Sequence, residues 1–256
     1  GERSWLIYRN AQGSQGEYLS DRTHLKILFA AKELDINSFI NLLKRWPECK
    51  GAFGADGRGF RLESSLWLVV RDFETHFAQV FKNYPQTLNL LRIALAFKEI
   101  ERALQLIKGY SESSQQVNKQ VVERLYQYLP FGKSQIMLLA ALLAESPLDP
   151  FLEGRISNNE VARRVLALAS KHHIKRHPAF FSLVTIFYQA SAASPLGEKL
   201  KSRTEYFMYG SEDKRVFDPQ RKRFRFASLL EEKYELLEEA IIHTTGNTIS
   251  RESRSE

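Results

Sequence analysis

The densest group of positively charged residues in this 256-residue chain is a basic and aromatic run near its C-terminal end. We call residues 221–226 the basic run, and it reads Arg221-Lys222-Arg223-Phe224-Arg225-Phe226. Four cations in six residues suit the phosphate groups of anionic lipid or of nucleic acid, and the two phenylalanines suit stacking on bases or entry into a lipid interface. The candidate lipid- or phosphate-binding residues are therefore Arg221, Lys222, Arg223, Phe224 and Arg225.

The same run has a second interpretation, in which its cations are neutralised inside the fold. Acidic residues follow closely, at Glu231-Glu232 and between Glu235 and Glu239, and Arg–Glu pairs with them would leave little free charge. If residues 223–226 form a strand, alternation places the phenylalanines inward and the cations outward. We favour internal pairing, then binding of anionic lipid such as a phosphoinositide, and then nucleic acid.

Three histidines close together, His172, His173 and His177, are the remaining candidates for metal chemistry. His173 and His177 lie four residues apart and can share a helix face, as two metal ligands on a helix must. However, no Asp or Glu lies between Glu160 and Glu198, and neighbouring Lys and Arg side chains would repel a cation. We predict no metal site, and expect a positively charged helix end instead.

The chain also lacks the usual signatures of nucleotide binding and of nucleophilic catalysis. The glycine-containing segment 51–59 has no Gly-Lys-Ser/Thr, and Gly132-Lys133-Ser134 lacks the upstream glycine of a phosphate-binding loop. Cys49 is a single cysteine, which excludes an intramolecular disulfide, and no Gly-x-Ser-x-Gly sequence occurs. The sequence therefore predicts no cofactor and favours a non-enzymatic role, with an enzyme assembled from scattered residues as the remaining alternative.

Composition and charge are those of an ordinary folded protein, with 43% hydrophobic residues, 26% charged residues and a net charge of +7. No window reaches the roughly 18–20 uninterrupted apolar residues of a membrane-spanning helix, and the longest apolar-rich stretch is 136–144. The chain starts without Met, a basic n-region or an apolar h-region, so we expect a piece of a longer protein. We expect a reducing, cytoplasmic location, or a peripheral membrane location if the basic run binds lipid.

Helical periodicity dominates after the first thirty residues and predicts an all-α fold. Predicted helices cover residues 36–46, 65–84, 86–108, 115–129, 134–145, 157–176, 178–193, 198–209 and 227–243. The apolar runs Trp5–Tyr8 and Leu25–Phe29, on either side of a glycine-containing turn, predict a short N-terminal β-hairpin, although the second run can equally open a helix. We divide the chain into an N-terminal segment (1–34), a helical core (35–209), and a C-terminal part (210–256) with a basic loop, an amphipathic helix and a frayed tail from Thr244.

Four helix ends share a pattern in which a bulky residue or histidine precedes proline. The prolines are Pro47, Pro85, Pro130 and Pro178, at spacings of 38, 45 and 48 residues. These spacings approach the roughly 40–47 residues of stacked helical-hairpin repeats. Stacked hairpins, an irregular helical bundle, and a mixed fold with strands in residues 1–60 all remain open.

We expect a non-enzymatic module that binds a protein partner through a groove between helix pairs. The candidate anchors are Trp46, Tyr84 and His177, which occupy equivalent points of the proline pattern or else plug the junctions between hairpins. The alternative is a membrane-targeting domain that reads anionic headgroups through the basic run, and nucleic acid is the least favoured partner. The Lys-, Leu-, Phe- and Ser-rich helical composition is similar to that of many bacterial proteins delivered into host cells.

Overall fold

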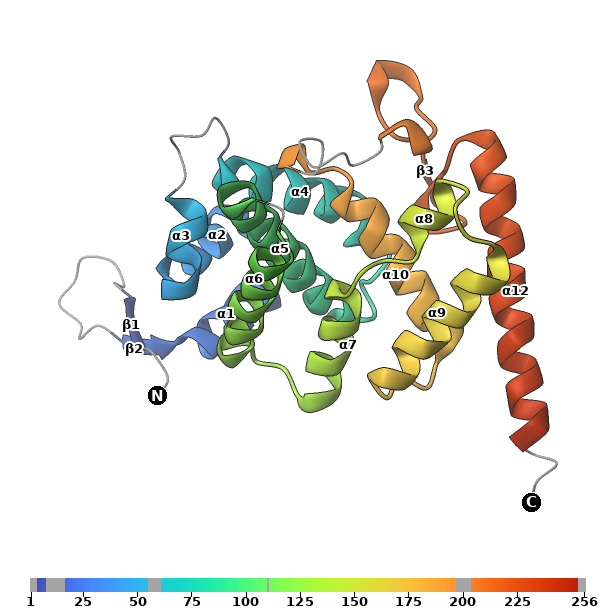
Figure 1. The fold of residues 1–256 in the computed structure, drawn as a ribbon. Helices are drawn as coiled ribbons and strands as arrows, with labels where there is room; N and C mark the ends of the chain where they lie inside the picture. The colour runs from blue at the N-terminus through green and yellow to red at the C-terminus, as the bar shows by residue number, and fades with distance from the viewer. Residues whose placement is uncertain (1–3, 8–16, 55–60, 110, 197–203, 253–256) are drawn as a thin grey trace.

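A computed structural model of the chain describes residues 4–7, 17–54, 61–109, 111–196 and 204–252. It has an all-α fold, as the helical periodicity predicts (Figure 1). The longer helices are α1 (Asp21–Ala30), α2 (Ile36–Arg45), α4 (Leu62–Phe77), α5 (Pro85–Lys108), α6 (Glu112–Leu125), α7 (Lys133–Leu143), α9 (Asn158–Lys171), α10 (His177–Ser191) and α12 (Ser228–Glu252). Shorter turns of helix are α3 (Lys50–Phe53), α8 (Leu148–Leu152), η1 (Pro47–Cys49), η3 (Tyr126–Tyr128), η4 (Thr204–Tyr206) and η5 (Ser211–Asp213).

Several helix ends follow directly from local sequence. The side chain of Asp35 accepts a hydrogen bond from the Ser38 N–H at the start of α2, and Ser157 does the same for Glu160 at the start of α9. Both are the caps that the sequence predicts. Pro85 opens α5, where its missing N–H costs nothing.

Helix α5 is the centre of the fold and packs against α3, α4, α6, α7 and α10. Its buried residues lie on all sides of the helix, which is the expected pattern for a helix surrounded by others. In a linear stack of hairpins each unit contacts only its neighbours. Here α10, late in the chain, contacts both α4 and α5, so the arrangement is an irregular bundle around α5.

A fully buried carboxylate ties three of these helices together. The Oε2 atom of Glu99 on α5 accepts hydrogen bonds of 2.6 Å from Ser65 on α4 and from Ser194, just after α10. Its Oε1 atom accepts a 2.8 Å bond from Arg102, which also donates to the Ser191 carbonyl at 2.7 Å. A buried charge is tolerated when it is paired and hydrogen-bonded in this way.

Within the described residues, two small antiparallel strand pairs accompany the helices. The N-terminal pair joins β1 (Ser4–Ile7) to β2 (Glu17–Ser20), with Ser4 opposite Ser20. The C-terminal pair joins β3 (Phe217–Asp218) to β4 (Arg223–Phe224). A short N-terminal strand pair is therefore confirmed, but its second strand precedes the run Leu25–Phe29. That run belongs to α1, which begins at Asp21, because the Ser20 side chain accepts a hydrogen bond from the Thr23 N–H and so caps the start of the helix.

Some predicted helix bounds are wrong. Helix α4 ends at Phe77, short of the predicted Tyr84, and the 198–209 helix fails at its end, where Phe207 and Tyr209 form β-bridges with Phe226 and Arg215. Residues 197–203 lie outside the described part of the chain. Helix α12 continues to Glu252, past the predicted end at residue 243.

Within the described residues, the stretch Lys133–Leu152 is long and apolar enough to cross a membrane by length and composition alone. Buried helices of a protein core pass the same test, and 44% of the most apolar window of this stretch is buried inside the fold. The stretch is divided between α7 and α8 by a bend that contains Pro147. It is weak evidence for a membrane span.

The residues before the repeated prolines do not share one environment. Trp46 is fully buried, stacks on Tyr128 at 4.7 Å between ring centroids, and contacts the edge of Phe97 at 6.4 Å. Tyr84, by contrast, is 65% exposed, and His177 is half-buried at the start of α10. Trp46 plugs a helix junction, as one of the two interpretations expects, so it is unavailable to a partner as an anchor.

This difference gives a direct test. We expect Trp46→Ala to lower the free energy of unfolding by about 3–5 kcal/mol, because it removes a large buried ring. Tyr84→Ala, at the equivalent point of the pattern, is the control and should change it by less than about 0.5 kcal/mol. Urea denaturation followed by circular dichroism measures both, and equal losses would contradict the assigned environments.

Candidate functional site

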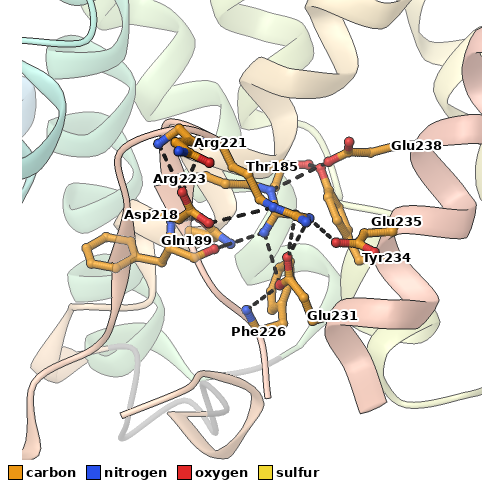
Figure 2. A network of polar contacts seen from close by, with 12 residues as sticks. Thr185, Gln189, Asp218, Arg221, Arg223, Phe226, Glu231, Tyr234, Glu235 and Glu238 are labelled. Atoms are coloured by element: carbon orange, nitrogen blue, oxygen red, sulfur yellow. Dashed lines mark hydrogen bonds and ion pairs between the residues drawn. The ribbon is translucent and has the colours of Figure 1, made fainter. Parts of the chain in front are cut away.

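The basic run covers the end of the β3–β4 turn and strand β4, and it leads into α12 (Figure 2). Arg223 is buried and forms a two-pronged ion pair with Glu231 in the first turn of α12, at 2.7 and 3.1 Å. Its guanidinium also lies 4.5 Å from the ring centroid of Tyr234. The Oε2 atom of Glu231 accepts a further 2.7 Å bond from the Phe226 N–H. Both charges are therefore satisfied within the fold.

Arg221 takes part in the same cluster from the solvent side. Its guanidinium pairs with Glu235 and, at 3.3 Å, with Glu231, while Asp218 lies 3.6 Å from its Nε. On the inner side, Arg223 also lies 3.5 Å from Glu238. We call Arg221, Arg223, Glu231, Glu235 and Glu238 the ion-pair cluster. Burial raises the pKa of Glu238, and the neighbouring Arg223 opposes that shift.

The remaining members of the basic run differ in their access to solvent. Phe224 is fully buried, with Phe77 and Phe217 against its ring and the Arg215 guanidinium 4.0 Å from its centroid. Arg225 is half-buried, and Lys222 is exposed with a left-handed backbone (φ 58°). The favoured internal pairing is thus found, and Phe224 points inward as predicted.

One detail of that prediction is wrong, because Arg223 does not face outward. Strand β4 is only two residues long, and both of its residues are buried. Helix α12 brings Glu231 to Arg223, while Gln189 of α10 hydrogen-bonds both the N–H and the carbonyl of Phe224. Strand alternation does not separate core from solvent here, because protein covers both faces of β4.

We expect the cluster to stabilise the fold. Arg223→Gln should lower the free energy of unfolding by about 3–5 kcal/mol, because it removes the two-pronged partner of the buried Glu231 and leaves only the longer, half-exposed contact with Arg221 at 3.3 Å. Lys222→Gln removes one charge from the adjacent, exposed position and should change it by less than about 0.5 kcal/mol. Urea denaturation of the two variants decides this, and an Arg223 variant as stable as the Lys222 control would show that the pair contributes nothing.

A second feature is a cleft of about 470 Å³ between α5, α7, α8 and α10, which we call the α5–α10 cleft. Its apolar lining includes Leu142, Val184 and Phe187. Its charged and polar lining includes Lys98, Arg102, Glu145, Asp149, Glu153, Arg155 and Tyr188. A concave site that combines apolar walls with a few polar groups is the usual form of a ligand site.

Asp149 is the distinctive residue of the cleft. It belongs to the single turn α8, between Pro147 and Pro150, and the Tyr188 hydroxyl on α10 donates a 3.0 Å hydrogen bond to its Oδ1. Asp149 is exposed, but the protein around its carboxyl excludes part of the surrounding water. This partial desolvation raises the pKa of Asp149. Sequence analysis missed this residue, although an acid enclosed by prolines and apolar residues is a weak local signal.

Two other candidates for chemistry, Cys49 and His172, lie apart from this cleft. Cys49 is fully buried, and burial raises its pKa to about 12, which makes the thiol unreactive in the folded state. The Nδ1 atom of His172 lies 3.1 Å from the Leu168 carbonyl, within its own helix end. Neither residue lines the α5–α10 cleft.

The environment of Asp149 can be measured directly. Its carboxyl should titrate above 3.8, the ordinary aspartate pKa, and Tyr188→Phe should raise the midpoint further, because the lost hydrogen bond favours the ionised form. Carbon-detected NMR of the side-chain carboxyls reports both values. Asp218, whose pKa is lowered by N–H donors from its own turn, is the reference in the same spectrum. A midpoint for Asp149 at or below that of Asp218 would contradict this assignment.

The ion-pair cluster and the α5–α10 cleft are the two features on which a function can be built. Comparison with family models, with curated proteins and with solved structures finds no match for this chain.

Proposed function

We propose that this chain is a non-enzymatic interaction module that holds a segment of a protein partner in the α5–α10 cleft. The observation that carries the proposal is the cleft itself, a concave site with apolar walls and with polar groups from α5, α8, α10 and the segment between α7 and α8. Its volume of about 470 Å³ lies in the range of roughly 300–1,000 Å³ that is typical of ligand sites. That volume suits a few side chains of a partner segment. The proposal includes a reducing, cytoplasmic location, which a single buried cysteine allows.

The walls of the cleft suit binding because they are fixed before a partner arrives. Arg102 lines the cleft and is held by Glu99 and by the Ser191 carbonyl. Tyr188, on α10, is oriented by its hydrogen bond to Asp149. A site whose side chains are already ordered loses less conformational entropy on binding.

The alternative, recognition of an anionic membrane through the basic run, has less support from the geometry. Arg223 and Phe224 are buried, and Arg221 is paired with acidic residues of α12. Lys222 is exposed, Arg221 is exposed at 41% of its side chain but paired, and Arg225 is half-buried. At roughly 1 kcal/mol per cation near an anionic surface, one or two free charges give little attachment.

A random library of 12-residue peptides displayed on phage tests the proposal. We expect the folded chain to select peptides whose binding is lost in Ala192→Trp and in Ala144→Trp, because each places a large ring in the cleft. Ala179→Trp, at an exposed position on the same helix as the Ala192 cap, is the matched control and should bind normally. Thermal unfolding confirms that all three variants fold.

Two results would overturn the proposal. One is the selection of no peptides, or of peptides that bind the two cleft variants as well as the parent. The other is selective binding to phosphatidylserine vesicles at physiological salt that Lys222→Glu abolishes, which would favour the membrane alternative.

A further inference from the structure

The charges that line the α5–α10 cleft are unequally paired. Every cation in the lining has a carboxylate partner: Arg102 pairs with Glu99 at 2.8 Å, Lys98 with Glu101 at 3.4 Å, and Arg155 with Glu153. Among the carboxylates that line the cleft, Asp149 and Glu145 form no ion pair with any described residue. With the partners Glu99 and Glu101 counted, five acids accompany three cations at the cleft, so its local charge is negative in a protein whose net charge is +7. Arg102 and Lys98 attract the Asp149 carboxylate electrostatically, but neither forms an ion pair with it.

Tyr188 orients the carboxylate of Asp149. Its hydroxyl occupies Oδ1 of Asp149, so that the other carboxylate oxygen remains free to accept a hydrogen bond. Phe187 and Val184, from the same helix, supply apolar wall in the same cleft. A long basic side chain suits this arrangement, because its aliphatic stem can pack on the apolar wall while its charged end reaches the carboxylate.

Positive charge next to the cleft limits where a cation can bind in it. A neighbouring hollow of about 290 Å³ shares Glu145 with the cleft, and it is lined by Arg163, Arg164 and Lys171 of α9. Arg163 and Arg164 share one acid, Glu160, so this hollow carries excess positive charge. A bound cation is therefore favoured on the Asp149 side of Glu145.

We propose that the α5–α10 cleft accepts a lysine or arginine side chain of the partner segment, with Asp149, oriented by Tyr188, as the carboxylate that binds its charged end. This inference deepens the proposed function and depends on it, because it assigns the chemistry of the segment that the cleft takes. Asp149 is exposed, but the protein around its carboxyl partly desolvates it and raises its pKa. A cation delivered to the site would recover part of the interaction that the carboxylate lost with water.

The test uses the full chain and n-butylguanidinium chloride, which reproduces the end of an arginine side chain on a short apolar tail. NMR titration at 0.1 M salt should show saturable shifts at the amides of Asp149, Tyr188 and Ala192, while sodium butyrate at the same ionic strength should shift none of them. Asp149→Asn should weaken binding by about tenfold or more, the loss expected when a charged hydrogen-bond partner is removed. Glu232→Gln, the same change at an exposed position on α12, is the control.

The outcomes separate the inference from the function on which it depends. If butylguanidinium binds equally well to Asp149→Asn, or does not bind the cleft at all, the inference is overturned. If the phage library has nevertheless selected peptides that require an open cleft, the proposed function stands without it. If both experiments fail, the cleft is not a binding site.

Discussion

The hydrogen-bonded carboxylate of Glu99 is the interaction on which the arrangement of the helices depends. It lies at the centre of the bundle and receives donors from α4, from α5 and from the end of α10. A buried charge of this kind is stable only while its partners stay in place. It therefore fixes where α10 lies against α4 and α5. Because Arg102 belongs to the same network and lines the α5–α10 cleft, the core and the cleft share one set of contacts.

Helix α10 connects this network to the C-terminal part of the chain. One face carries Tyr188 into the cleft, and other positions carry Gln189 to the backbone of Phe224 and Thr185 to the hydroxyl of Tyr234 at 2.6 Å. The ion-pair cluster then fixes the β3–β4 turn against the first turns of α12 (Figure 2). Helix α12 thus packs along α9 and α10 and holds the C-terminal part of the chain against the bundle.

The pairing of charges explains how a protein with a net charge of +7 has few free cations in its most basic segment. Arg221, Arg223 and Arg215 are each matched by an acid from another element. In the cleft the balance is reversed, because the cations are paired and Asp149 is not. The net charge of the chain therefore predicts the local charge of neither the basic run nor the α5–α10 cleft. The pairing of nearby residues determines which ligand chemistry each surface favours.

The sequence alone predicted the all-α class, the caps at Asp35 and Ser157, and the pairing of the basic run with the acidic residues after it, because these depend on residues close together in the chain. It did not separate Trp46 from Tyr84, which precede equivalent prolines, since only the packing of α5 and η3 around the first buries it. The sequence alone also did not predict the α5–α10 cleft. Its walls come from segments up to about a hundred residues apart, and the carboxyl of Asp149 acquires its environment only when they meet.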